Sequence, residues 1–117
     1  MIQADKAAQF QALHQRTGAF LIPNPWDPGS ARILAGLGFE ALATSSAASA
    51  ASMGRRDGQL SREQALAHVR AIVGATALPV SADLENGFSH TPEGVEQTVL
   101  LAAEAGLVGC SGEHSGA

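Results

Sequence analysis

One stretch of the sequence decides the fold: Pro79-Val80-Ser81-Ala82-Asp83-Leu84-Glu85-Asn86-Gly87-Phe88. Its first half is a short run of small and apolar residues, which predicts a buried β-strand over 80–84. Its second half turns polar and reaches a glycine, as is typical of the loop that follows a strand. The stretch therefore predicts a strand that delivers acidic side chains at its carboxyl end.

Three further runs have the same short apolar character, at 19–22, 41–45 and 107–111. Longer segments with helical spacing of apolar residues separate them, at about 5–15, 28–37, 61–73 and 91–103. Four strands that alternate with helices indicate βαβ units and a parallel sheet. Because the strand runs are continuously apolar, we expect them to be buried on both faces.

Local signals mark where the helices begin. Asp27 before Pro28 is a candidate N-cap, with proline at the first helical position. Ser61 with Gln64 three residues later fits a capping box, and Thr91 is the candidate N-cap of the last helix. The small-residue stretch over 46–60 predicts a flexible loop.

Two architectures fit this order of elements. An open doubly wound sheet of four strands would be complete at 117 residues and would form a small binding domain. A (β/α)8 TIM barrel needs ~250 residues, so the chain would be its first half. The sequence ends six residues after the fourth strand, without the helix that should follow. We therefore expect one partial barrel domain over 1–117, of the α/β class, truncated after its fourth strand.

Composition narrows the range of functions. Seven basic and eleven acidic residues give a formal net charge of −4, which argues against nucleic acid or an anionic membrane as the main partner. The single cysteine excludes an internal disulfide, and no apolar stretch approaches the ~20 residues of a membrane span. Without an apolar leader, the chain reads as a cytoplasmic domain.

Four acidic residues follow the predicted strands, where ligands gather in both architectures. They are Asp57, Asp83, Glu85 and Glu113. Converging carboxylates repel one another unless a cation or protons compensate, and hard oxygen ligands suit Mg²⁺ or Mn²⁺ rather than zinc. The alternative is that each is a solvated acid at the end of a loop.

Other polar residues have simpler explanations. The capping role explains Asp27, and His14 and His68 lie on helical segments as surface or packing residues. Cys110 lies within an apolar strand, where we expect a small core residue rather than a nucleophile.

Taken together, several motifs resemble the isocitrate lyase / phosphoenolpyruvate mutase superfamily, especially its 2-methylisocitrate lyase-like members. They run in the right order from about Phe20 to the last residue. The motifs are Asn24-Pro25-Trp26-Asp27-Pro28-Gly29-Ser30-Ala31-Arg32, Ala43-Thr44-Ser45-Ser46-Ala47, Met53-Gly54, Asp57-Gly58, the stretch over 79–88, and Gly109-Cys110-Ser111-Gly112-Glu113.

The resemblance implies a barrel of the phosphoenolpyruvate-binding type that binds Mg²⁺ and acts on 2-oxo acid-related carboxylates. It implies that Asp83 touches the metal, while Asp57, Glu85 and Glu113 hold it mostly through water. It also implies that Ser45, Ser46 and Ala47 bind a carboxylate of the substrate. Carbon–carbon cleavage beside a carboxylate gives an enolate-like oxyanion, which a divalent ion stabilises. Mutases and hydrolases use similar sites, so the fold does not name the reaction.

Several departures from the family pattern limit what is expected of this chain. Ala47 replaces a frequent glycine, Gly112 replaces a bulky apolar residue, and His114 replaces an aspartate. The sequence ends before the gating loop in which lyases of the family carry their catalytic cysteine, so the catalytic residue is unknown.

The resemblance implies a Mg²⁺-dependent lyase or mutase whose full-length parent is a homo-oligomer, and the departures predict that this fragment is inactive. The alternative is a non-catalytic half-barrel module that pairs with itself or with another chain to cover open sheet edges.

Overall fold

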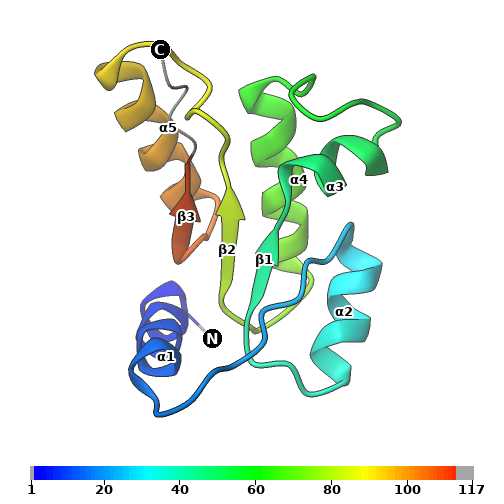
Figure 1. The fold of residues 1–117 in the computed structure, drawn as a ribbon, viewed down its shortest axis with the longest axis vertical. Helices are drawn as coiled ribbons and strands as arrows, with labels where there is room; N and C mark the ends of the chain where they lie inside the picture. Colours follow the sequence, from blue (N-terminus) through cyan, green and yellow to red (C-terminus); the bar gives the residue numbers. More distant parts are fainter. Residues whose placement is uncertain (1, 113–117) are drawn as a thin grey trace.

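A computed structural model of the chain describes residues 2–112. Three parallel strands form the sheet in the order β1 (Leu42–Thr44), β2 (Val80–Asp83) and β3 (Gly109–Ser111). The register places Leu42 beside Val80, and Ala82 beside Cys110. The helices are α1 (Gln3–Gln15), α2 (Pro28–Gly36), α3 (Ser46–Ser52), α4 (Arg62–Gly74) and α5 (Pro92–Glu104). The order along the chain is α1, α2, β1, α3, α4, β2, α5 and β3, so helices separate the three parallel strands, as expected of βαβ units (Figure 1).

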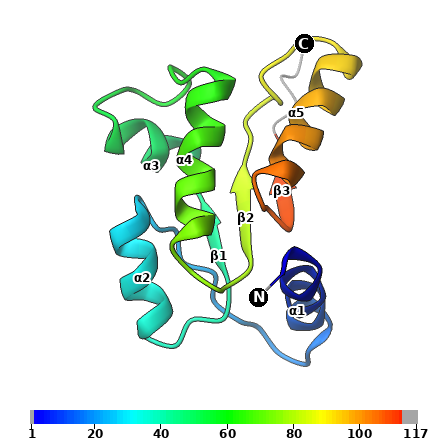
Figure 2. The ribbon, with the colours of Figure 1, turned by 180° about the vertical axis from the view of Figure 1, so that it is seen from behind.

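The helices α4 and α5 cover one face of the sheet. They lie behind the strands in Figure 1 and in front of them in Figure 2. The core forms between these two layers, and burying each of its large aliphatic side chains contributes ~1.5–3 kcal/mol. Its larger members are Leu42, Leu66, Val69, Ile72, Val80, Leu84 and Leu107.

The strands are buried on one face more than on the other, so the expectation of burial on both faces was wrong. Along β2 and the residue after it, Val80, Ala82 and Leu84 are buried while Ser81 and Asp83 are only half-buried. The physical reason is that α4 and α5 pack on the same side of the sheet. Asp83 therefore comes from the face that these helices leave open.

The predicted strand over 19–22 was also wrong: residues 2–112 contain three strands, and none of them includes this segment. The segment runs into Pro23 and Pro25, which have no backbone N–H to donate to a neighbouring strand. Pro23, the residue after this segment, instead accepts a hydrogen bond: the backbone N–H of Ala43 in β1 donates to its carbonyl at 3.1 Å. Leu21 is 76% exposed.

The predicted flexible loop over 46–60 contains a helix instead. Ser45 caps α3, since its hydroxyl accepts a hydrogen bond from the backbone N–H of Ala48 at 3.3 Å. Four of the seven residues of α3 are small Ala side chains, and Ala has the strongest helix propensity. The small residues that predicted a flexible loop therefore form a helix, and the loop begins only at Met53.

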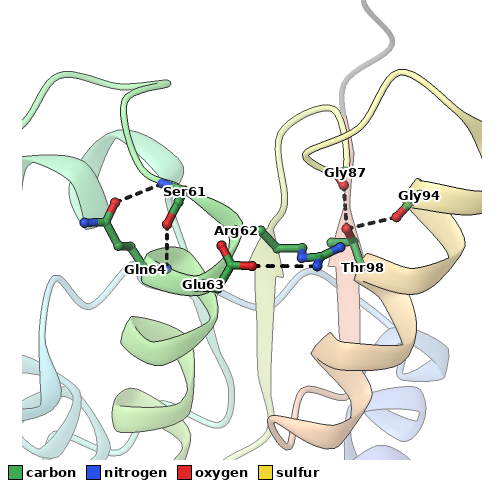
Figure 3. Close-up of polar contacts among 7 residues, drawn as sticks. All are labelled: Ser61, Arg62, Glu63, Gln64, Gly87, Gly94 and Thr98. Carbon is green, nitrogen blue, oxygen red and sulfur yellow. Dashed lines mark hydrogen bonds and ion pairs between the residues drawn. The ribbon is translucent and has the colours of Figure 1, made fainter.

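The predicted helix starts are confirmed. Asp27 Oδ1 accepts from the backbone N–H of Ser30 at 2.7 Å, and Thr91 Oγ1 accepts from that of Gly94 at 3.0 Å. Ser61 and Gln64 form both hydrogen bonds of the capping box at the start of α4 (Figure 3). These bonds satisfy N–H groups that a helix leaves unpaired.

Helix α1 lies at the end of the sheet where the strands begin (Figure 1). The Gln3 side-chain amide donates to the carbonyls of Ala103 and Leu107, at 2.7 and 2.9 Å. The ammonium of Lys6, which is only 8% exposed, donates to the carbonyl of Thr76 at 3.2 Å. These bonds hold α1 to the segments that lead into β2 and β3, and leave the carboxyl ends of the strands open at the opposite end.

Candidate active site

The carboxyl end of β2 forms a tight polar turn. Asp83 Oδ1 accepts a hydrogen bond from the backbone N–H of Glu85 at 2.9 Å, and the N–H of Gly87 donates to the carbonyl of Leu84 at 2.8 Å. Glu85 has φ +55°, a left-handed conformation that is uncommon for residues other than glycine. The strained backbone at Glu85 is thus held in place by the side chain of Asp83.

The turn is fixed from α5 as well. The buried hydroxyl of Thr98 donates to the carbonyl of Gly87 at 2.6 Å and also lies 3.1 Å from the carbonyl of Gly94 (Figure 3). Gly87 has φ +79°, and a Cβ there would lie 2.9 Å from a methyl group of Val95. The loop that carries Glu85 is therefore tightly packed against α5.

Helix α3 approaches the same turn. The hydroxyl of Ser46 donates to Asp83 Oδ2 at 3.2 Å, which joins the start of α3 to the end of β2. Ser45 and Ser46 are half-buried, whereas Ala47 is exposed. Of the three predicted carboxylate-binding residues, Ser46 therefore has a direct contact with a predicted metal-binding residue.

A small cavity lies between these elements. It has a volume of about 170 Å³, and Ser46, Asp57, Gly58 and Glu85 line it. Gly58 has φ +88°, and a Cβ on it would lie 3.9 Å from Glu85 Oε1. The structure thus brings Asp57 and Glu85 to one cavity, with Asp83 joined to it through the Ser46 hydroxyl. Glu113, the fourth predicted acid, and His114 lie outside the described residues.

The chemistry of this cavity fits Mg²⁺, although residues 2–112 contain no group of three or more His, Cys, Asp or Glu side chains that could hold a metal ion by themselves. The donors here are carboxylate and hydroxyl oxygens, which Mg²⁺ prefers. Because Mg²⁺ usually keeps several waters, one or two direct carboxylates are enough. Asp57, Asp83 and Glu85 are the described residues that would hold the ion.

Asp27 contributes to the fold rather than to this cavity. Hydrogen bonds from the backbone and the side chain of Ser30 lower the pKa of the Asp27 carboxyl below its usual value. This lowered pKa is what an ionised N-cap should show. The prediction that Asp27 is a capping residue is therefore confirmed.

Cys110 differs from expectation, whereas His68 does not. Cys110 is exposed, not a core residue, because β3 pairs only with β2 and lies at the edge of the described sheet. His68, predicted as a surface or packing residue, is a packing residue: it is half-buried and hydrogen-bonded to α3 and to the backbone of Trp26. The sequence carries no signal for that contact, because its partners lie 16 to 42 residues away.

The fold and the position of the cavity define an α/β-barrel class of protein, with polar residues gathered at the carboxyl ends of the parallel strands. The family model described as phosphoenolpyruvate phosphomutase matches residues 10–116. The chain therefore belongs to the phosphoenolpyruvate mutase / isocitrate lyase superfamily, whose members include lyases and mutases.

Relatives support this membership. An uncharacterized protein of Mycobacterium tuberculosis is 32% identical over 98 residues, which cover 84% of this chain and 38% of the relative. The chain thus spans less than two fifths of the length of the curated relatives that it matches.

Within the described residues, no helix is both long and apolar enough to cross a membrane.

Solved structures agree with the fold. A candidate lyase/mutase of Burkholderia cenocepacia J2315 is 57% identical with a TM-score of 0.90, over 92% of this chain and 39% of that one. The phosphoenolpyruvate phosphomutase of Streptomyces platensis subsp. rosaceus is 28% identical with a TM-score of 0.83, over 89% and 36%. A 2,3-dimethylmalate lyase is 27% identical with a TM-score of 0.79, over 90% and 38%. The predicted fold class, part of a TIM barrel, is confirmed.

Proposed function

We propose that this chain supplies the metal- and carboxylate-binding part of a Mg²⁺-dependent lyase or mutase for small 2-oxo acid-related carboxylates. Mn²⁺ is the alternative ion. The observation that carries the proposal is the cavity that Ser46, Asp57 and Glu85 line together, beside the Ser46–Asp83 hydrogen bond. The lyase and mutase relatives support the reaction class.

In this proposal the bound ion supplies positive charge that stabilises an enolate-like oxyanion during bond cleavage. The residues of the chain prepare the site. Asp83 and Glu85 are fixed by the turn after β2, and Asp57, in the loop before α4, lines the same cavity as Glu85. Ser45, Ser46 and Ala47 bind and orient a substrate carboxylate, with Ser46 already placed at the cavity. Glu113 completes the set of acids.

The catalytic group itself is not assigned to this chain. We propose that residues 1–117 alone do not turn over substrate, because the resemblance places the catalytic cysteine of lyases in a later loop. The acidic composition and single cysteine are consistent with a cytoplasmic whole protein, for which we propose a homo-oligomer.

Paramagnetic Mn²⁺ tests the metal site. Titration into the ¹⁵N-labelled chain should broaden the amide signals of residues 46, 57–58 and 83–87 first, and excess Mg²⁺ should restore them. Asp83→Asn should weaken the effect at least tenfold. The matched control is Asp5→Asn, which removes an exposed acid from α1, at the other end of the sheet. Uniform weak broadening over all acidic segments would overturn the proposed site.

A second candidate function is a half-barrel module that pairs with another copy of itself. It is favoured by an apolar cavity of about 190 Å³ beside the edge strand β3, lined mainly by Val99, Ala102, Leu107 and Val108. Leu100, on the same helix as Val99, is 55% exposed. Sedimentation that shows a dimer, lost on Leu100→Glu, would support pairing, whereas a monomer with a cooperative melting transition would contradict it.

A further inference from the structure

The side chain of His68 connects three separate elements. It projects from α4, and its Nδ1 lies 3.0 Å from the hydroxyl of Ser49 in α3. Its Nε2 lies 2.7 Å from the carbonyl of Trp26 and 3.3 Å from the hydroxyl of Ser52. The imidazole therefore joins α3 and the segment before α2 to the helix layer that covers the sheet.

The hydrogen-bond pattern assigns one neutral tautomer to the ring. The carbonyl of Trp26 can only accept, so Nε2 carries the proton. The hydroxyl of Ser52 donates to the carbonyl of Ser49 at 2.8 Å, so it can only accept from Nε2–H. Nδ1 is then the acceptor for the hydroxyl of Ser49. In this tautomer, each nitrogen of the half-buried ring has a partner.

Helix α3 consists only of small residues. Its seven residues, Ser46–Ser52, are all Ala or Ser, so it has no large aliphatic side chain to anchor it in the core. Ser49 is only 6% exposed, and its backbone N–H donates to the carbonyl of Ser45 at 2.9 Å. A ring that holds the Ser49 side chain therefore also fixes the first turn of α3.

The first turn of α3, which His68 contacts through Ser49, also reaches the cavity. Ser46, in the same turn, donates to Asp83 Oδ2 and lines the cavity with Asp57 and Glu85. We propose that His68 is a positioning residue: it holds α3 so that Ser46 meets the acidic cavity. The role in α3 stands on the contacts above, while its consequence for carboxylate binding rests on the proposed function.

Amide hydrogen exchange in the full chain tests the positioning directly and needs no ligand. In His68→Leu, exchange at residues 49–53 should rise at least tenfold, with residues 66–73 of α4 unchanged. His68→Asn places a polar group near the position of Nδ1 and should restore protection, whereas His68→Gln, which reaches toward Trp26, should not. Unchanged exchange in His68→Leu would overturn the proposal.

Ser49→Ala is the second variant, and it keeps the test valid if His68→Leu fails to fold. Alanine has the higher helix propensity, so a purely local effect would protect α3 more. The proposal predicts the opposite, a rise in exchange at residues 49–53. Combined with His68→Asn, which otherwise restores protection, Ser49→Ala should remove the rescue. Greater protection in Ser49→Ala would overturn the proposal.

Oxalate, a planar dicarboxylate that resembles the enolate of a 2-oxo acid, then probes the cavity at saturating Mg²⁺. His68→Leu should weaken oxalate binding at least tenfold and leave Mg²⁺ affinity within twofold, because the metal-binding acids lie outside α3. Equal affinity of wild type and His68→Leu for oxalate would overturn the positioning role. If wild type binds neither Mg²⁺ nor oxalate, the proposed function fails, and hydrogen exchange alone decides the role of His68.

Discussion

Replacement of Glu85 separates the strain in the turn from the chemistry of the cavity. Glu85 has φ +55°, whereas its backbone N–H is held by Asp83 Oδ1 at 2.9 Å. Asparagine adopts the left-handed conformation more readily than other residues with a Cβ. Glutamine does not, and it keeps nearly the shape of glutamate. Glu85→Asn and Glu85→Gln therefore remove the same charge but differ in backbone strain.

The left-handed conformation costs an ordinary residue ~1–2 kcal/mol, and we expect asparagine to recover about 1 kcal/mol of it. Glu85→Asn should thus melt about 4 °C above Glu85→Gln, as a change of this size predicts for a domain of this length. Differential scanning calorimetry without divalent ions measures the difference. Both variants should lose Mg²⁺ affinity equally in calorimetric titration. Identical melting temperatures would refute the strain argument, and undiminished Mg²⁺ affinity would refute the role of the carboxylate.

Three further predictions concern contacts that stabilise the fold. Thr98→Val should cost ~1–3 kcal/mol in urea denaturation because it removes a buried donor from a loop carbonyl, while Thr98→Ser should recover most of the loss. Gly106→Ala should destabilise the folded protein by more than 1 kcal/mol, because φ is +101° and the new Cβ would lie 2.7 Å from a methyl group of Val73 in α4. The control is Gly74→Ala, which should not destabilise the protein because its new Cβ would meet no atom within 4 Å. The pKa of Asp27 is lowered in the folded state, so its contribution to stability is present above its ordinary pKa of 3.8 and is lost as pH falls through the folded value. The stability difference between wild type and Asp27→Asn should therefore shrink on acidification; a constant difference from pH 6 to pH 2 would contradict this.

Local signals made the helix starts predictable. A cap and its partner lie three residues apart, so Asp27 with Ser30 and Ser61 with Gln64 can be recognised without a tertiary structure. The strand over 19–22 failed for the opposite reason: an apolar run becomes a strand only when a neighbour pairs with it, and prolines limit the pairing here.

The candidate site could be predicted in part. The carboxyl ends of parallel strands meet at one edge, which is why Asp57 and Glu85 were expected together and line one cavity. The contact between His68 and Ser49 could not be predicted, because nothing in a helix of small residues indicates which distant ring will meet it. The left-handed conformation of Glu85 could not be predicted either, because glycine is the residue that usually occupies such a position.

The burial of Lys6 has a practical consequence. It is the only lysine of the chain, and its ammonium lies against the carbonyl of Thr76 where α1 meets the start of the sheet. Acylating reagents attack exposed amines, so the ε-amine should react only when this helix detaches. The rate of acylation at Lys6, located by mass spectrometry of peptides, would then report how often the N-terminal helix leaves the rest of the protein.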